Sequence, residues 1–137
     1  MVFEHHLKVR MYDTDMAQIL FFGNQYRFMH DALEELLAVE GLTMDKIFRE
    51  LGYGFVIVHS EADYLAALRV GDAIKITVTV DHIGTSSFSF NYTLYRQDKR
   101  VGTGKTVHVV IDNKTHQKQV IPESLRQSLE KYVDSDR

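Results

Sequence analysis

The sequence predicts an α+β fold in which an antiparallel sheet wraps around one long central helix. Apolar residues recur at helical spacing over about residues 24–39, and four later segments show strand-like runs of alternating or β-branched residues. The connections around 83–86 and 97–99 are short enough for hairpins. Because a single helix can bury a broad apolar stripe only against the sheet, the sheet should wrap around it.

The first expected element is a strand from Phe3 to Tyr12. Leu7, Val9 and Met11 fall on one side of an alternating apolar and polar pattern, which is typical of a half-buried strand. We expect this strand to stop at Asp13.

A long helix is predicted from Asn24 to Val39, with Asn24 as its N-cap and Gly41 as its stop. Its buried stripe would consist of Phe28, Met29, Ala32, Leu33, Leu36 and Leu37. A shorter helix should follow over Thr43–Leu51, since Thr43 can cap it and Gly52 comes directly after it.

The second half of the chain predicts an antiparallel meander. Its strands are expected at Phe55–Leu65, Ala73–Ile83, Ser87–Arg96 and Arg100–Asp112. Val120 and Ile121 are expected to end a last short strand, and Pro122 with Glu123 to start a terminal helix.

The composition favours one globular domain over the whole chain, 1–137, with a polar end at about 134–137 that we expect to fray. The net charge of −3 and the scattered Lys and Arg residues argue against nucleic acid as a partner. There is no cysteine, so disulfides, thiolate zinc sites and cysteine nucleophiles are excluded. No signal-peptide core and no membrane-spanning run is present, so we expect a cytoplasmic protein without a membrane partner.

The segment from Tyr12 to Asn24 is the most informative part of the chain for chemistry. It places Asp13 and Asp15 after a strand, then an unusually apolar loop, then the start of the long helix. A carboxylate beside apolar surface can act as base or nucleophile, and the free N–H groups of a helix start can hold an oxyanion. From these residues alone, the simpler interpretation is that both aspartates hydrogen-bond their own turn.

Three motifs, which occur in a fixed order along the chain, favour the catalytic interpretation over the turn-forming one. The stretches YDTDMAQILFFGNQYRFMHDALE, VIVHSEADYLAALRVGDAIKITVTV and HIGTSSFSFNYTLYR resemble successive signatures of hot-dog-fold acyl-CoA thioesterases of the 4-hydroxybenzoyl-CoA thioesterase family. Within that family, the chain resembles most the 1,4-dihydroxy-2-naphthoyl-CoA hydrolase-like branch. The resemblance covers about residues 3–112 and implies a hot-dog fold and acyl-CoA thioester hydrolysis.

The resemblance also implies roles for individual residues. Asp15 matches the catalytic carboxylate, which attacks the thioester carbonyl or activates water, whereas Asp13 matches a commonly acidic, non-catalytic position. The backbone amides of Phe22 and Gly23 match the oxyanion donors. The chain departs from the family where Gln18 replaces the usual glycine, where Ala67 replaces a common proline and where Phe22 replaces His or Tyr.

The loop residues predict the kind of acyl group. Candidate pocket residues are Ile19, Leu20, Phe21, Asn24 and His59. For His59, which falls in an expected strand, the simpler interpretation is a partly buried histidine outside the pocket. The apolar residues among the candidates, with Phe22, favour an aromatic or medium-chain acyl group. Coenzyme A would enter only as part of the substrate, no other cofactor is expected, and its phosphates would need local cations. The plausible cations are Arg69, Lys75, Arg96, Lys99, Arg100 and Lys105, none of which we single out.

Sheet edges are commonly covered by pairing between subunits, so we expect a homo-oligomer, at least a dimer and more readily a homotetramer.

Other functions fit the residues less well. No metal-ligand motif is present, and the helical pair His30 and Glu34 is as easily a surface interaction. A hot-dog dehydratase or hydratase needs a positioned histidine in a motif that we do not find. A non-catalytic acyl-CoA-binding module would not need the carboxylate of Asp15.

Overall fold

The computed structural model describes residues 1–134. Most of the polar end that was expected to fray, residues 135–137, lies outside the described residues. The last described residue, Asp134, donates its N–H to the carbonyl of Val80 at 3.4 Å.

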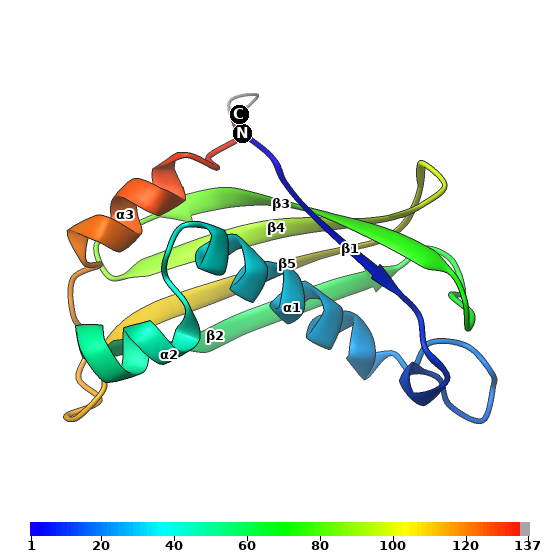
Figure 1. The fold of residues 1–137 in the computed structure, drawn as a ribbon, viewed down its shortest axis with the longest axis horizontal. Helices are drawn as coiled ribbons and strands as arrows, with labels where there is room; N and C mark the ends of the chain where they lie inside the picture. Colours follow the sequence, from blue (N-terminus) through cyan, green and yellow to red (C-terminus); the bar gives the residue numbers. More distant parts are fainter. Residues whose placement is uncertain (135–137) are drawn as a thin grey trace.

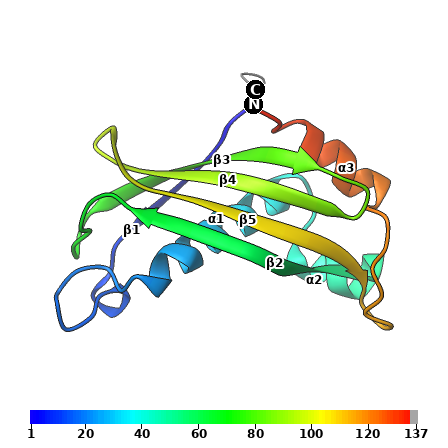
Figure 2. The ribbon, with the colours of Figure 1, turned by 180° about the vertical axis from the view of Figure 1, so that it is seen from behind.

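The sheet has five antiparallel strands in the order β1-β3-β4-β5-β2 (Figures 1 and 2). Their bounds are β1 Phe3–Lys8, β2 Tyr53–Tyr64, β3 Ala73–Ile83, β4 Ser87–Arg96 and β5 Lys99–Asp112. Consecutive strands β3, β4 and β5 form the predicted meander. Strand β2 pairs with β5 and β1 pairs with β3, so β1 and β2 are the two edge strands of the sheet.

Helix α1, Gly23–Val39, crosses one face of this sheet, in front of it in Figure 1 and behind it in Figure 2. The predicted apolar stripe is fully buried against the strands: Phe28, Met29, Ala32, Leu33, Leu36 and Leu37. Close approach of helix and sheet requires a glycine at Gly104, because a Cβ atom there would collide with the side chain of Met29. The predicted hot-dog architecture is therefore confirmed.

The remaining helical segments are short. Over the predicted helix Thr43–Leu51 the chain forms one turn of α2, Met44–Lys46, followed by a wider π-type turn η2, Ile47–Leu51. Thr43 caps α2 as predicted, accepting a hydrogen bond from the N–H of Lys46 at 3.2 Å. Helix α3, Glu123–Glu130, packs beside β3 (Figure 1).

The predicted last strand at Val120 and Ile121 is wrong. The chain there makes only an isolated bridge between Ile111 and Lys118, and Ile121 donates its N–H to the carbonyl of Thr85 at 2.9 Å.

Two predictions at the start of α1 and the end of β1 are also wrong. Strand β1 ends at Lys8, and a 3-10 turn η1, Met11–Asp13, follows because the carboxylate of Asp13 accepts the N–H of Arg10 at 2.8 Å. Met11 is consequently 77% exposed. Helix α1 begins with Phe22 at its N-cap position, and the side chain of Asn24 binds elsewhere.

Candidate functional site

The loop between η1 and α1 is a small hairpin. Thr14 and Leu20 form an isolated antiparallel bridge. Inside it, Asp15 donates its N–H to the carbonyl of Ile19 at 3.1 Å and accepts the N–H of Gln18 at its own carbonyl at 2.9 Å. Gln18 adopts a φ of 65°, the left-handed conformation that such three-residue hairpin loops require. This conformation explains why glycine is usual at this position in the family that the sequence resembles.

The carboxylate of Asp15 lies on the tip of this hairpin and is exposed. Its Oδ1 atom accepts the N–H of Ala17 at 2.9 Å, which is the turn-forming role of aspartate. Its Oδ2 atom has no hydrogen-bond partner among residues 1–134. Within the described part of the chain, this carboxylate is therefore exposed to solvent and one of its oxygens accepts no hydrogen bond.

The N-terminus of α1 supplies free donors next to this hairpin. Within the described chain, the N–H groups of Phe22 and Gly23 donate no hydrogen bond, as is usual for the first positions of a helix. The carbonyl of Phe22 accepts the hydroxyl of Tyr64, at the end of β2, at 2.8 Å. A residue of the sheet, Tyr64, thereby fixes the peptide group between Phe22 and Gly23.

A cavity of about 360 Å³ opens between the hairpin, the start of α1 and the segment after β2. It is lined by Ile19, Leu20, Phe22, Gln25, Tyr64, Leu65, Ala66, Ala67 and Leu68. Of the predicted pocket residues, Ile19 and Leu20 line it together with the predicted oxyanion donor Phe22. A larger groove of about 420 Å³ lies between β1, β3 and β4. It contains none of the predicted catalytic or acyl-pocket residues, although the candidate cation Lys75 lines it.

The other predicted pocket residues lie outside this lining. The ring of Phe21 packs against that of Phe22, with centroids 4.7 Å apart. Asn24 points to the carbonyl of Asp13. His59 lies on the outer edge strand, where its Nε2 atom is 3.1 Å from the carboxylate of Glu61.

Gln25 is a site residue that the sequence did not suggest. Its side chain is buried at the floor of the cavity and donates to the carbonyls of Asp63 and Thr103, each at 3.1 Å. It lies against Gly102, where a Cβ atom would come within 2.9 Å of its amide. The sequence carries no signal that Gln25 is buried, because Gln25 is polar and directly follows Asn24, which was wrongly predicted to be the N-cap.

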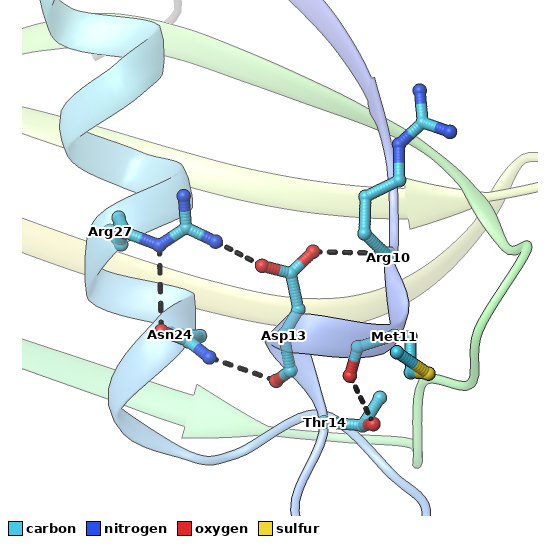
Figure 3. A network of polar contacts seen from close by, with 6 residues as sticks. All are labelled: Arg10, Met11, Asp13, Thr14, Asn24 and Arg27. Atoms are coloured by element: carbon cyan, nitrogen blue, oxygen red, sulfur yellow. Dashed lines mark hydrogen bonds and ion pairs between the residues drawn. The ribbon is translucent and has the colours of Figure 1, made fainter.

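At the base of the hairpin lies a polar network around Asp13 (Figure 3). The carboxylate of Asp13 is buried and forms an ion pair with Arg27 of α1. The sequence predicts that Asp13 ends a strand, hydrogen-bonds its own turn and is not catalytic, and its bond to the N–H of Arg10 agrees with the turn role. The ion pair with Arg27 was not predicted.

Several of the candidate cations are already engaged. Arg96 pairs with Asp72 at 2.9 Å and Lys105 with Asp81 at 3.1 Å. Over residues 1–134, no group of three or more potential metal-ligating side chains is found. No helix in that range has the length and apolar character that crossing a membrane requires.

The chain is similar to known proteins of one superfamily. Residues 9–129 match the model of the thioesterase-like superfamily. The chain belongs to this superfamily. A 1,4-dihydroxy-2-naphthoyl-CoA hydrolase from Nostoc punctiforme is 32% identical to this chain over 130 residues. The matched residues cover 95% of this chain and 88% of the relative. The family resemblance predicted from the three motifs is confirmed.

Solved structures share the fold of this thioesterase. A 1,4-dihydroxy-2-naphthoyl-CoA thioesterase from Synechocystis superposes with a TM-score of 0.88 at 22% identity, covering 99% of this chain and 98% of the other. A gentisyl-coenzyme A thioesterase superposes with a TM-score of 0.84 at 25% identity, covering 92% of this chain and 98% of the other. These likenesses confirm the predicted hot-dog fold.

Proposed function

We propose that this thioesterase hydrolyses an aromatic or medium-chain acyl-CoA to the free acid and coenzyme A. The observation that carries the proposal is the pair of free N–H groups at Phe22 and Gly23. Phe22 lines an apolar cavity, and both groups directly follow the hairpin of Asp15. Thioester hydrolysis needs a nucleophile and a place for the oxyanion, and these two features supply one each.

Asp15 is the carboxylate of the reaction. In one route its free oxygen attacks the thioester carbonyl carbon, the C–S bond breaks, coenzyme A leaves as a thiolate, and water then hydrolyses the mixed anhydride. In the other route Asp15 accepts a proton from a water molecule whose oxygen attacks that carbon. In both, the N–H groups of Phe22 and Gly23 donate to the carbonyl oxygen as it becomes negative.

The acyl group occupies the cavity. Its walls are mainly aliphatic and aromatic, and among the lining side chains only the Tyr64 hydroxyl and the Gln25 amide are polar. A volume of about 360 Å³ lies in the range of small-molecule sites. The names of the relatives, dihydroxynaphthoyl-CoA and gentisyl-CoA enzymes, favour an aromatic acyl group over an aliphatic one.

The active assembly contains at least two copies of the chain. Strand β2 is a 12-residue edge whose Val56, Ile57 and Val58 are exposed. An edge of this length with apolar side chains favours antiparallel pairing with the same strand of a second copy.

The test is release of free thiol from a panel of aromatic and aliphatic acyl-CoAs, with and without a chelator. We expect the highest kcat/KM with an aromatic acyl-CoA, and the same rate in the chelator. Binding without thiol release would instead favour an acyl-CoA-binding module, and hydration of a 2-enoyl-CoA would favour a dehydratase. Activity lost in chelator and restored by zinc would contradict the metal-free mechanism.

A further inference from the structure

Asp13 is 2% exposed and carries its charge into the interior beside the hairpin. Its partner is the guanidinium of Arg27, which comes from the second turn of α1 and is half-exposed (Figure 3). The other carboxylate oxygen accepts the N–H of Arg10 at 2.8 Å. One side chain thus joins the segment after β1 to the helix.

The backbone carbonyl of Asp13 makes a second set of contacts. It accepts the N–H of Phe21 at 3.0 Å and the side-chain amide of Asn24 at 2.8 Å. Asp13, at the end of η1, directly precedes the hairpin, and Phe21 directly follows it, before α1. Asn24 in turn lies 3.5 Å from the Nε atom of Arg27. The base of the hairpin and the first turns of α1 are therefore one hydrogen-bonded unit.

This unit controls where Asp15 stands. Among residues 1–134, the carboxylate of Asp15 is held only by its own turn, through the N–H of Ala17. Its place relative to the N–H groups of Phe22 and Gly23 therefore depends on how the base of the hairpin is fixed to α1. Removing one partner of a buried ion pair leaves an uncompensated charge, and pairs of this kind contribute little net stability. A contribution to stability is therefore a weak explanation for the ion pair between Asp13 and Arg27.

We propose that Asp13 and Arg27 are positioning residues, which hold the Asp15 hairpin in register with the start of α1 for thioester hydrolysis. The inference rests on the proposed function, because it assigns them an effect through Asp15. Neither residue lines the cavity.

The hairpin has a second attachment that keeps it folded when this unit is weakened. Leu20 donates its N–H to the carbonyl of Leu68 at 2.8 Å, which ties the hairpin to the segment before β3. Asp13→Asn and Arg27→Gln should therefore shift the hairpin without unfolding the protein. A displacement near 1 Å at reacting groups can cost about 10²-fold in rate.

The experiment is a double-mutant cycle between the positioning residues and Asp15. Asp13→Asn and Arg27→Gln are each made in the wild-type and the Asp15→Asn background, and kcat and KM are measured with the best acyl-CoA of the panel. Arg49→Gln is the matched control, because Arg49 forms an exposed ion pair with Asp45 at 2.8 Å far along the chain. Thermal unfolding of each variant shows that it is folded at the assay temperature.

We expect Asp13→Asn and Arg27→Gln to lower kcat by about 10- to 100-fold, with KM changed less than about threefold. In the Asp15→Asn background the same changes should lower the residual kcat less than about threefold. Arg49→Gln should leave kcat unchanged. Where Asp13→Asn does not fold, Arg27→Gln carries the test, since its side chain is half-exposed.

An equal loss of kcat in both backgrounds would overturn the positioning role, because it would mean that the variants act without Asp15. Wild-type kcat in both single variants would overturn it too. Those results leave the proposed function standing. Failure of that function has a separate signature: Asp15→Asn itself would keep the wild-type kcat, and the positioning role would fall with it.

Discussion

The hydroxyl of Tyr64 donates a hydrogen bond to the carbonyl of Phe22 at 2.8 Å, across 42 residues of sequence. That carbonyl belongs to the same planar peptide as the N–H of Gly23, so fixing one end fixes the direction of the other. Burial, with the nearby Tyr26, raises the pKa of Tyr64 above its ordinary value of 10.0, so its hydroxyl keeps the proton it donates. Tyr64 thereby orients one of the two proposed oxyanion donors.

Replacing Tyr64 by Phe should lower kcat with little change in KM. The hydrogen bond is worth roughly 1 kcal/mol, or about fivefold in rate. Tyr95→Phe is the control, since the ring of Tyr95 lies by Lys75 on another part of the sheet. Steady-state thiol release measures both variants, and an unchanged kcat in Tyr64→Phe would mean that this peptide does not face the oxyanion.

Replacing Asp15 by Asn should lower kcat by at least about 10²- to 10³-fold, the cost typical of losing one stabilising group of the transition state. KM should change little, because the amide keeps the size of the side chain. The exposed Asp45→Asn is the control. Asp13→Asn cannot serve, since Asp13 is buried and ion-paired. Near-normal kcat in Asp15→Asn, with loss on substituting His59, would move the catalytic role to His59.

Placing a charge on the edge of β2 should separate the subunits. We expect the wild-type protein to sediment as a dimer or tetramer at micromolar concentration, and Val58→Lys to shift it toward the 15.9 kDa single chain. Activity should fall with the loss of assembly. A wild-type protein that sediments as a fully active 15.9 kDa monomer contradicts the proposed assembly.

The core contains a histidine that should make stability depend on pH. His108 is fully buried and stacks on Phe88, with ring centroids 5.2 Å apart. Its Nε2 atom bonds the hydroxyl of Thr106 at 2.8 Å, while Nδ1 has no partner among the described residues. Burial, with a smaller contribution from His30, lowers the pKa of His108 from 6.5 to about 4.

Because the folded pKa lies below the unfolded one, the unfolded chain binds a proton first as the pH falls. His108 therefore lowers the free energy of unfolding progressively between pH 6.5 and about 4, and has no such effect above pH 6.5. Between pH 7.5 and 5.5 the loss should be about 1.4 kcal/mol. Urea unfolding at these two pH values measures it. In His108→Phe the difference should largely vanish, whereas in the exposed His59→Phe it should persist.

The fold of this thioesterase could be predicted from local patterns. The apolar stripe from Phe28 to Leu37 has helical period, and the alternating run from Ser87 to Arg96 has strand period, so each element carries its own signal. The hairpin of Asp15 is likewise local, since its turn closes within Thr14–Leu20. Its motif was therefore readable without knowledge of the fold.

What lies around that hairpin was decided by contacts between distant segments. Asn24 has the side chain of a good N-cap, but the carbonyl of Asp13 provides a partner 11 residues away and the helix begins before it. The bonds of Tyr64 to Phe22 and of Gln25 to Thr103 span 42 and 78 residues. Periodicity describes neighbours within a few residues, whereas these partners meet only once the helix has packed into the sheet. The loop residues of the cavity could therefore be named from the sequence, but Tyr64 and Gln25, which come from other elements, could not.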